Sequence, residues 1–396
     1  MQAFGGDGGS AYTAFGIGDV RYFPSTRSAG MGFTGIGLPS PNYINSMMPA
    51  AWSRITRVRI EANAIYEGIN TAETNKSLYQ ARGLFNGALL ALPISPTHGI
   101  VFVGGFTPYS FRGYNTSLTA SQLGVDYTIN EIGEGGLTKA QVGLSYAPGE
   151  DLSFGASLNY LFGTTTIERA FIPKTTAYSG GTLFIEEENR GINFTLSSMF
   201  NGFGKIAEGL RPLSIGFVVT TQANMTVDLI NRIDFTAEKD TFSTSEKSMT
   251  IPVAFGVGAA WQVADRWLLA ADYYSQAWSK ARFDGQPFLF IRNSSRFGVG
   301  AEKLPIPYAN KWFDKLAYRF GFSYSPTYYQ VFGESINQWS VTGGLTMPIS
   351  GETRLNIGLE YGERGVKKAN LVKDNILRVS FSLNIVEPWF VRYEEE

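Results

Sequence analysis

The residue types that carry enzymatic chemistry are scarce in this chain. It has one histidine, His98, and no cysteine. His98 stands in a Pro-Thr-His-Gly sequence that is typical of a turn, and a Ser-His-Asp set needs a histidine held by a rigid element. The run Glu186-Glu187-Glu188 is typical of a solvated surface, because catalytic carboxylates need a buried cleft. We therefore expect a protein that is not an enzyme.

A Gly-x-Gly-x-x-Gly sequence at Gly30, Gly32 and Gly35 could cradle a phosphate. In a dinucleotide site this sequence follows a strand, opens a helix and precedes an acidic residue by about 20 positions. Here Pro39 and Pro41 follow, and no strand–helix–strand unit surrounds it. We expect no cofactor and no metal. The balance of 33 basic against 34 acidic residues also gives no reason to expect nucleic acid as a partner.

One pattern recurs along the chain. From Leu377 to Ile385 the odd-numbered residues are apolar and the even-numbered residues are polar. Successive side chains of a strand point to opposite sides, so this segment has one apolar and one polar face. The polar faces of such segments carry many charges, which the buried face of a β-sandwich would not tolerate. We assign these charged residues to a lumen: Arg57, Arg59, Glu61, Asp272, Arg296, Glu302, Arg319, Arg354, Glu360, Arg364 and Arg378.

The alternating segments predict strands, and no run reaches the ~20 apolar residues of a membrane-spanning helix. Short turns alternate with longer polar segments, expected as loops at 113–136, 168–189, 226–248 and 283–293, as in outer-membrane barrels. Aromatic residues near the strand ends fit interfacial girdles, or β-propensity alone. The predicted fold is all-β, a closed antiparallel transmembrane β-barrel of about 14 strands. The predicted strands are 54–67, 78–92, 98–112, 137–148, 152–167, 190–203, 212–225, 249–263, 266–282, 294–303, 314–326, 337–348, 353–366 and 374–386.

The first fifty residues lack this alternation and are rich in small residues and proline. A 14-strand cylinder is too wide for side chains alone to fill, so we expect an N-terminal plug, or hatch, inside the lumen. Its characteristic residues are Gly30, Gly32, Gly35, Asn45, Pro49 and Ala50. Glycines with lumen parity would let a backbone lie close to the wall. They are Gly143, Gly155, Gly256, Gly258, Gly298, Gly300 and Gly358.

Several stretches carry a family resemblance. They are Ser28–Gly37, 251–261, 265–273, 295–302 and 317–321. Together they resemble the FadL/TodX-like family of outer-membrane transporters for long-chain fatty acids and aromatic hydrocarbons. Met48-Pro49-Ala50 stands where members carry Asn-Pro-Ala. The sequence after Glu387 resembles the tails of Bacteroidota-type members, including the barrel that serves type IX secretion.

The resemblance implies a monomeric barrel with a lateral opening at a kinked third strand. Gly104, Gly105 and Pro108 interrupt that strand here and form the candidate gate, or else a bulge near the rim. The resemblance also implies substrate capture between the third and fourth external loops, whose apolar residues form a binding patch or a core between the loops. These residues are Phe171, Ile172, Tyr178, Phe184, Leu229, Ile230 and Phe235.

The expected division is a hatch at 1–52, a barrel at 53–387 and a periplasmic tail at 388–396. The expected location is the bacterial outer membrane, with a signal peptide that was removed before this numbering begins. The first functional hypothesis is passive uptake of long-chain fatty acids or aromatic hydrocarbons by hatch rearrangement and lateral release. The alternative is a protein-binding subunit of a secretion or envelope complex. Expected partners are hydrophobic small molecules or lipids, outer-membrane lipid and lipopolysaccharide, and envelope proteins.

Overall fold

The computed structural model describes residues 2–3, 9–22, 25–73, 77–122, 125–175, 177, 179–235, 238–306, 309–368 and 371–387. The predicted capture residue Tyr178 and the predicted tail 388–396 lie outside the described residues. No helix in these described ranges is long and apolar enough to cross a membrane.

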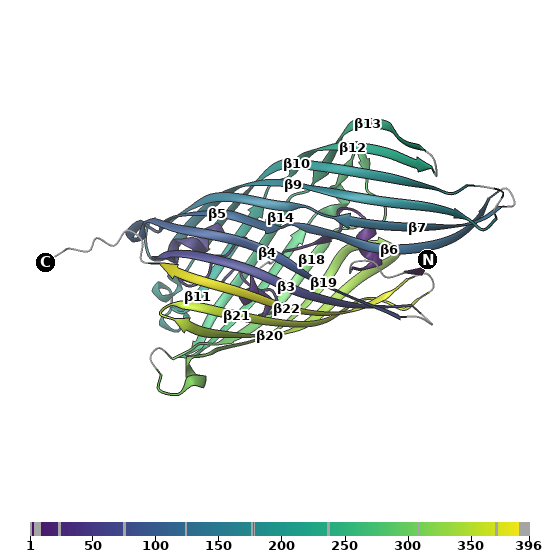
Figure 1. Ribbon diagram of the computed structural model, residues 1–396. Coiled ribbons are helices and arrows are strands. Elements are labelled where there is room, and N and C mark those ends of the chain that lie inside the picture. Colours follow the sequence, from purple (N-terminus) through teal and green to yellow (C-terminus); the bar gives the residue numbers. More distant parts are fainter. Residues whose placement is uncertain are drawn as a thin grey trace.

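Fourteen antiparallel strands close into a barrel, which confirms the predicted fold (Figure 1). Each strand pairs with the next around the wall, and the last strand pairs with the first in a register that places Arg378 opposite Glu67. In wall order the strands are β3 (Val58–Ala72), β4 (Ser77–Ser95), β5 (Ile100–Pro108), β8 (Thr138–Tyr146), β9 (Leu152–Pro173), β10 (Gly181–Phe200), β11 (Leu213–Thr220), β14 (Ala254–Ala264), β15 (Trp267–Gln276), β18 (Ser294–Lys303), β19 (Ala317–Val331), β20 (Glu334–Ser350), β21 (Thr353–Gly365) and β22 (Lys373–Glu387).

The two faces of the wall have opposite polarity. In β22, Leu377 and Phe381 are exposed on the outside, whereas Arg378 and Ser382 are buried on the inside. Apolar residues face outward because the hydrocarbon of a bilayer is their favourable solvent, and polar residues face inward. The alternation that the sequence shows is therefore the alternation between lipid and lumen.

Three of the predicted loops are strands, which corrects that part of the prediction. β6 (Ser110–Gln122) and β7 (Val125–Gly135) replace the loop at 113–136, and β12 (Ala223–Phe235) and β13 (Glu238–Ile251) replace the loop at 226–248. The loop at 168–189 is mostly the far ends of β9 and β10. Apolar and polar residues do not alternate along most of these extensions, so the period-2 signal of a strand is weak there.

One end of the barrel, called the short-turn end, carries the connections that the sequence predicts to be short turns. Two of the connections at this end are longer than the others. Residues 201–212 join β10 to β11 and contain η4 (Gly202–Lys205) and η5 (Glu208–Leu210). Residues 304–316 join β18 to β19 and contain η7 (Trp312–Lys315). The remaining elements are β1 (Gln2–Ala3), η1 (Ala11–Ala14), β2 (Asp19–Val20), α1 (Thr26–Ala29), η2 (Pro49–Arg54), η3 (Pro96–His98), η6 (Trp278–Lys280), β16 (Arg282–Phe283) and β17 (Gln286–Pro287).

Candidate functional site: the lumen and the N-terminal segment

The backbone of the N-terminal segment, residues 9–22 and 25–57, lies against the inner wall. A Cβ added to Gly155 would stand 2.3 Å from the carbonyl carbon of Pro49, and one added to Gly321 would stand 2.1 Å from the nitrogen of Gly32. Real Cβ atoms do not approach backbone so closely, so the wall needs glycine at these positions. Of the predicted lumen glycines, Gly256, Gly258, Gly298, Gly300 and Gly358 also face this segment. Gly143 does not, because its nearest atoms belong to β9.

Of the three glycines of the rejected phosphate motif, Gly30 and Gly32 lie where this segment touches β18 to β20, whereas Gly35 contacts Asp272 of β15. Gly32 has a left-handed backbone (φ 65°), and its N–H donates to Thr342 Oγ1 at 2.9 Å. A Cβ on Gly30 would meet Gly344 Cα at 3.0 Å. The motif thus allows a tight turn against the wall.

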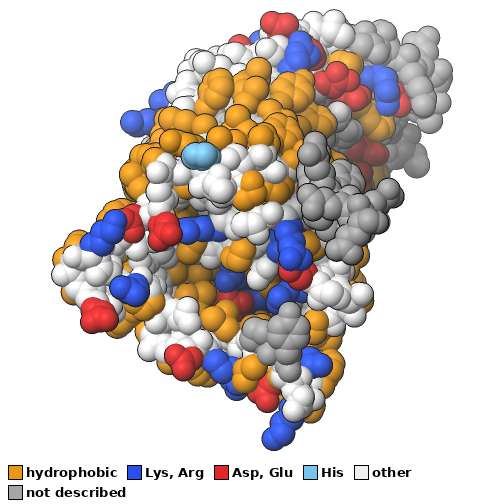
Figure 2. Space-filling view, turned by 90° about the vertical axis from the view of Figure 1, so that its left-hand side faces the viewer, with side chains coloured by type: hydrophobic (Ala, Val, Ile, Leu, Met, Phe, Trp, Pro, Cys, Tyr) orange, Lys and Arg blue, Asp and Glu red, His pale blue; other side chains and the backbone are white. Residues whose placement is uncertain are grey.

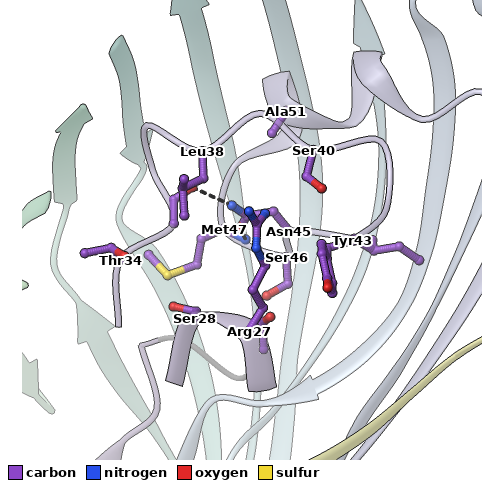
Figure 3. Close-up of a pocket in the computed structure, with 13 residues that line it drawn as sticks. Arg27, Ser28, Thr34, Leu38, Ser40, Tyr43, Asn45, Ser46, Met47 and Ala51 are labelled. Carbon is purple, nitrogen blue, oxygen red and sulfur yellow. Dashed lines mark hydrogen bonds between the residues drawn. The ribbon is translucent and has the colours of Figure 1, made fainter. Parts of the chain in front are cut away.

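Asn45 connects distant parts of the segment to one another (Figure 3). Its side-chain nitrogen donates to the carbonyl oxygen of Gly35 at 2.7 Å, and its side-chain oxygen accepts from the N–H of Met47 at 3.1 Å. Its backbone oxygen accepts from the indole of Trp52 at 2.6 Å. The cavity that these residues surround measures about 30 Å³. A space of this size holds one or two water molecules and no elongated solute.

Pro49 and Ala50 begin η2 at the opposite wall. The Ala50 N–H donates to Ser197 Oγ of β10 at 2.8 Å. Both residues are buried. The six residues predicted for the hatch therefore all lie within the segment where it packs on itself or on the wall.

A cluster of buried charges joins β2 to the wall. Asp19 accepts from Arg364 at 2.9 Å and pairs with Arg378 at 3.4 Å. Arg378 also bonds Glu67 and contacts Glu360 at 3.1 Å. Burial raises the pKa of the Asp19 carboxyl, but the three guanidiniums of Arg364, Arg21 and Arg378 outweigh it and hold that pKa below its usual range. Asp19 therefore stays ionised and bound.

A second charge cluster anchors α1. Arg27 bonds Glu302 at 2.5 Å, and Arg319 bonds the other oxygen of the same carboxylate at 2.7 Å. Arg319 also donates to the Tyr43 hydroxyl at 2.8 Å. The Glu302 carboxylate of the wall thus pairs with Arg27 from the N-terminal segment and with Arg319 from the wall, so all three buried charges have partners.

The wall is interrupted beside the candidate gate. β4 pairs with β5 only as far as Ala88 and Phe106, and β5 ends at Pro108. Beyond this point the edge of β6 pairs with β1 and β2 of the N-terminus. Gly105 has φ 151°, and a Cβ there would stand 2.2 Å from the oxygen of Ala88. A Cβ on Gly104 would meet only side chains, the ring of Phe102 at 3.4 Å and Val142 at 3.8 Å. The N-terminal strands therefore occupy the edge that the interruption exposes.

An apolar pocket of about 330 Å³ opens on the side opposite the short turns. Ile17, Leu137, Met249 and Phe288 line it together with Arg112. The Arg112 guanidinium donates to the oxygen of Gly16 and lies 3.6 Å from Glu187, while its Nε has no hydrogen-bond partner among the described residues. The pocket could hold a small apolar or amphipathic molecule.

The comparisons with known proteins place this geometry in a family. The model of the family described as BamG matches residues 2–394. The chain belongs to the BamG family. No curated protein matches it.

Solved structures similar to this BamG-family chain are FadL-like outer-membrane barrels. A FadL homologue from Pseudomonas aeruginosa is 14% identical with a TM-score of 0.65, covering 94% of this chain and 99% of that one. The toluene transporter TbuX of Ralstonia pickettii is 14% identical with a TM-score of 0.59, covering 91% and 97%. The monoaromatic hydrocarbon channel CymD is 15% identical with a TM-score of 0.58, covering 94% and 99%. At 14% to 15% identity, this similarity supports the barrel fold alone.

The predicted capture residues that the structure describes lie in strands of this BamG-family barrel and not on loops. Phe171 and Ile172 belong to β9, Phe184 to β10, and Leu229, Ile230 and Phe235 to β12. Phe184 lies opposite Arg232 and Ile230 opposite Glu186, so these two apolar side chains share a face. Leu229 lies opposite Glu187 on the other face. The residues are thus divided between the two faces of the extended wall, and the structure describes no side chain for Phe235.

Several charged residues of the lumen were missed at the sequence level. Glu67 and Asp374 could have been predicted to face the lumen, because they have the same parity in their strands as Glu61 and Arg378. The contacts of Asp19 and Arg21 could not have been predicted, because apolar and polar residues do not alternate in their segment and their partners are more than 40 residues away in the sequence.

Asp272 of β15 is the wall residue that holds the turn at Gly35. One of its oxygens accepts from the backbone N–H groups of Gly35 and Ile36, at 2.6 Å and 2.7 Å. We expect Asp272→Ala to lower the free energy of unfolding by about 2–4 kcal/mol, because it leaves two buried N–H groups unpaired. Urea unfolding of the protein in lipid vesicles measures this loss. Asp265→Ala, in the exposed turn before β15, is the control, and equal losses for the two variants would contradict the prediction.

Proposed function

We propose that this BamG-family barrel is a protein-binding subunit of a BAM-associated envelope assembly, and that it acts without catalysing a reaction. The family match over residues 2–394 carries the proposal, because the name BamG indicates a BAM-associated protein. The likeness to hydrocarbon channels rests on 14% to 15% identity and speaks for the fold.

The contents of the lumen support this proposal. Two clusters of buried ion pairs, around Asp19 and around Glu302, join the N-terminal segment to the wall. The cavity within this segment measures about 30 Å³, and the one beside Tyr109 and Lys139 about 50 Å³. A channel would have to break such contacts at each passage, and separating one buried partner costs about 3–5 kcal/mol. A permanent plug suits a barrel that serves as a platform.

The proposal is tested by purification from native membranes. A tagged copy of the chain, extracted in mild detergent, should bring down a Bam protein in constant ratio, and a tag on that protein should bring down this chain. An unrelated barrel of the same membrane, carrying the same tag, controls for co-extraction. Recovery of the chain alone under both tags would contradict the proposal.

The second candidate function is passive uptake of hydrophobic molecules by hatch movement and lateral release. Two observations favour this second function. The wall is interrupted between β4 and β6, and an apolar pocket of about 330 Å³ lies at the end of the barrel opposite the short turns. In this hypothesis β2 must leave the edge of β6, because it lies where the opening would form.

A disulfide between β2 and β6 tests the uptake hypothesis. Val20 pairs with Ser110, and paired Cα atoms in antiparallel strands lie about 4.5–5.5 Å apart, within disulfide range. The chain has no cysteine, so Val20→Cys with Ser110→Cys adds the only thiols. If uptake is the function, oxidation should abolish entry of a fluorescent fatty acid into cells and a reductant should restore it. Each single variant is the control, and uptake that oxidation leaves unchanged speaks against a moving hatch.

A further inference from the structure

The short-turn end of the barrel is hollowed. Figure 2 looks onto this end and shows blue and red side chains around and inside a central hollow. A cavity of about 680 Å³ lies between the N-terminal segment and the wall. Its floor is formed by residues 39–43, and Leu268 and Ala317 are among its wall residues. The cavity is too small for a folded domain and large enough for a few residues of extended chain.

The lining of this cavity is cationic. It contains Arg27, Arg54, Arg211 and Arg354 against one carboxylate, Glu302. Glu302 already bonds Arg27 and Arg319, so it does not neutralise the other three cations. Among the described residues no ion pair is formed by Arg54, Arg211 or Arg354, and Arg354 Nε is buried with no hydrogen-bond partner. A buried guanidinium nitrogen without an acceptor is costly, so an anionic occupant would stabilise it.

The two long connections of this end present apolar side chains beside the cavity. Leu304 and Pro305, at the base of the 304–316 connection, line the cavity, and Arg211 and Pro212 do so from the 201–212 connection. The same connections expose Phe313 (71%), Trp312 (53%) and Ile206 (73%). Arg266 fixes the 304–316 connection by donating to Leu304 and to Asp314. Exposed aromatic residues next to arginines are the composition that protein interfaces favour.

We propose that the cavity at the short-turn end, with the 304–316 connection beside it, binds an acidic, extended segment of a partner protein. This inference deepens the proposed function and rests on it. The occupant is acidic because the three arginines lack counter-charges, and extended because the cavity admits no domain. It carries an apolar residue next to its acidic ones, because the 304–316 connection, whose base lines the cavity, exposes Trp312 and Phe313.

A peptide experiment tests the charge part of this inference. The full chain, in nanodiscs of zwitterionic lipid, is titrated with fluorescein-labelled hexaglutamate and with labelled hexalysine. We expect hexaglutamate alone to bind, and binding to weaken as salt is raised. Arg211→Ala with Arg354→Ala should reduce the affinity at least about tenfold, because it removes two guanidinium groups that would bond the glutamate side chains. Lys280→Ala with Arg282→Ala, at the opposite end of the barrel, removes the same number of positive charges and is the control. Equal binding by the double variant and the control, or no binding of hexaglutamate, would overturn the inference.

Two more measurements identify what fills the cavity. In the first, the chain ending at Glu387 is titrated, because the chain's own residues Glu394 to Glu396 are acidic. If hexaglutamate binds only after this truncation, the occupant is the chain itself and the inference is overturned. In the second, the double arginine variant and Trp312→Ala are purified from native membranes. Reduced recovery of the Bam partner with these variants supports the inference. Undiminished recovery overturns the docking site and leaves the proposed function standing, whereas absence of a partner for the unaltered chain overturns the proposed function itself.

Discussion

Replacing Arg378 with methionine is expected to lower the free energy of unfolding by about 3–5 kcal/mol, because removing one partner leaves buried charges uncompensated. The guanidinium of Arg378 contacts Glu67, Glu360 and Asp19. Two of these carboxylates belong to the wall and the third to β2, so the substitution weakens the barrel and the seat of the N-terminal segment together. Methionine keeps most of the side-chain volume, which limits the cavity contribution.

The loss is measured by urea unfolding in lipid vesicles, with the heat-modifiable gel band of the barrel as readout. Lys368→Met is the control, because Lys368 pairs with Glu334 on the surface, where such pairs contribute about 0–1 kcal/mol. If the Arg378 variant unfolds at the same urea concentration as the control, the buried cluster does not stabilise the barrel and the prediction is wrong.

Replacing Gly321 with valine is expected to displace the N-terminal segment and open a conducting pore. A Cβ at this position would stand 2.1 Å from the nitrogen of Gly32 and 2.3 Å from the carbonyl carbon of Met31. Both atoms belong to backbone, which cannot turn aside as a flexible side chain can. A 14-strand cylinder is wide enough to conduct ions once it is no longer filled. Planar-bilayer recordings should therefore show steady conductance for this variant and little for the unaltered protein.

The matched control for this variant is Gly343→Val in the neighbouring strand β20. Gly343 has the parity of the outward-facing Val341, and a Cβ there meets only the oxygen of Arg319, at 3.9 Å. This variant adds the same side chain to the outer face of the wall. Closed recordings from both variants would show that the N-terminal segment tolerates displacement at Gly32 without leaving the lumen.

The barrel fold could be predicted because the alternation of apolar and polar residues that indicates it lies within each strand. In β22 the alternation from Leu377 to Ile385 reports the contrast between lipid and lumen, and each residue carries its own part of that signal. The glycines that face the N-terminal segment were predictable for the same reason, since Gly298 and Gly300 stand on the polar parity of their strand.

The charge clusters and the wall extensions could not be predicted in this way. The contact of Asp19 with Arg364 joins residues 345 positions apart, and no local pattern pairs them. Phe184 and Leu229 were expected on loops, yet they lie in β10 and β12, which pair with each other. A strand that meets the same solvent on both sides leaves no period in its sequence.

The charge cluster around Asp19 also constrains the order in which the protein forms. β2 precedes all fourteen wall strands in the chain, yet the ionic partners of its Asp19, Arg364 and Arg378, lie on the last two of those strands. β22 must also pair with β3 before the lumen has a continuous wall. Contacts across nearly the whole chain are slow to form, because the loop between the partners must close first. β2 therefore reaches its final contacts only after β21 and β22 have joined the wall, and its binding to them marks the completion of the closed barrel.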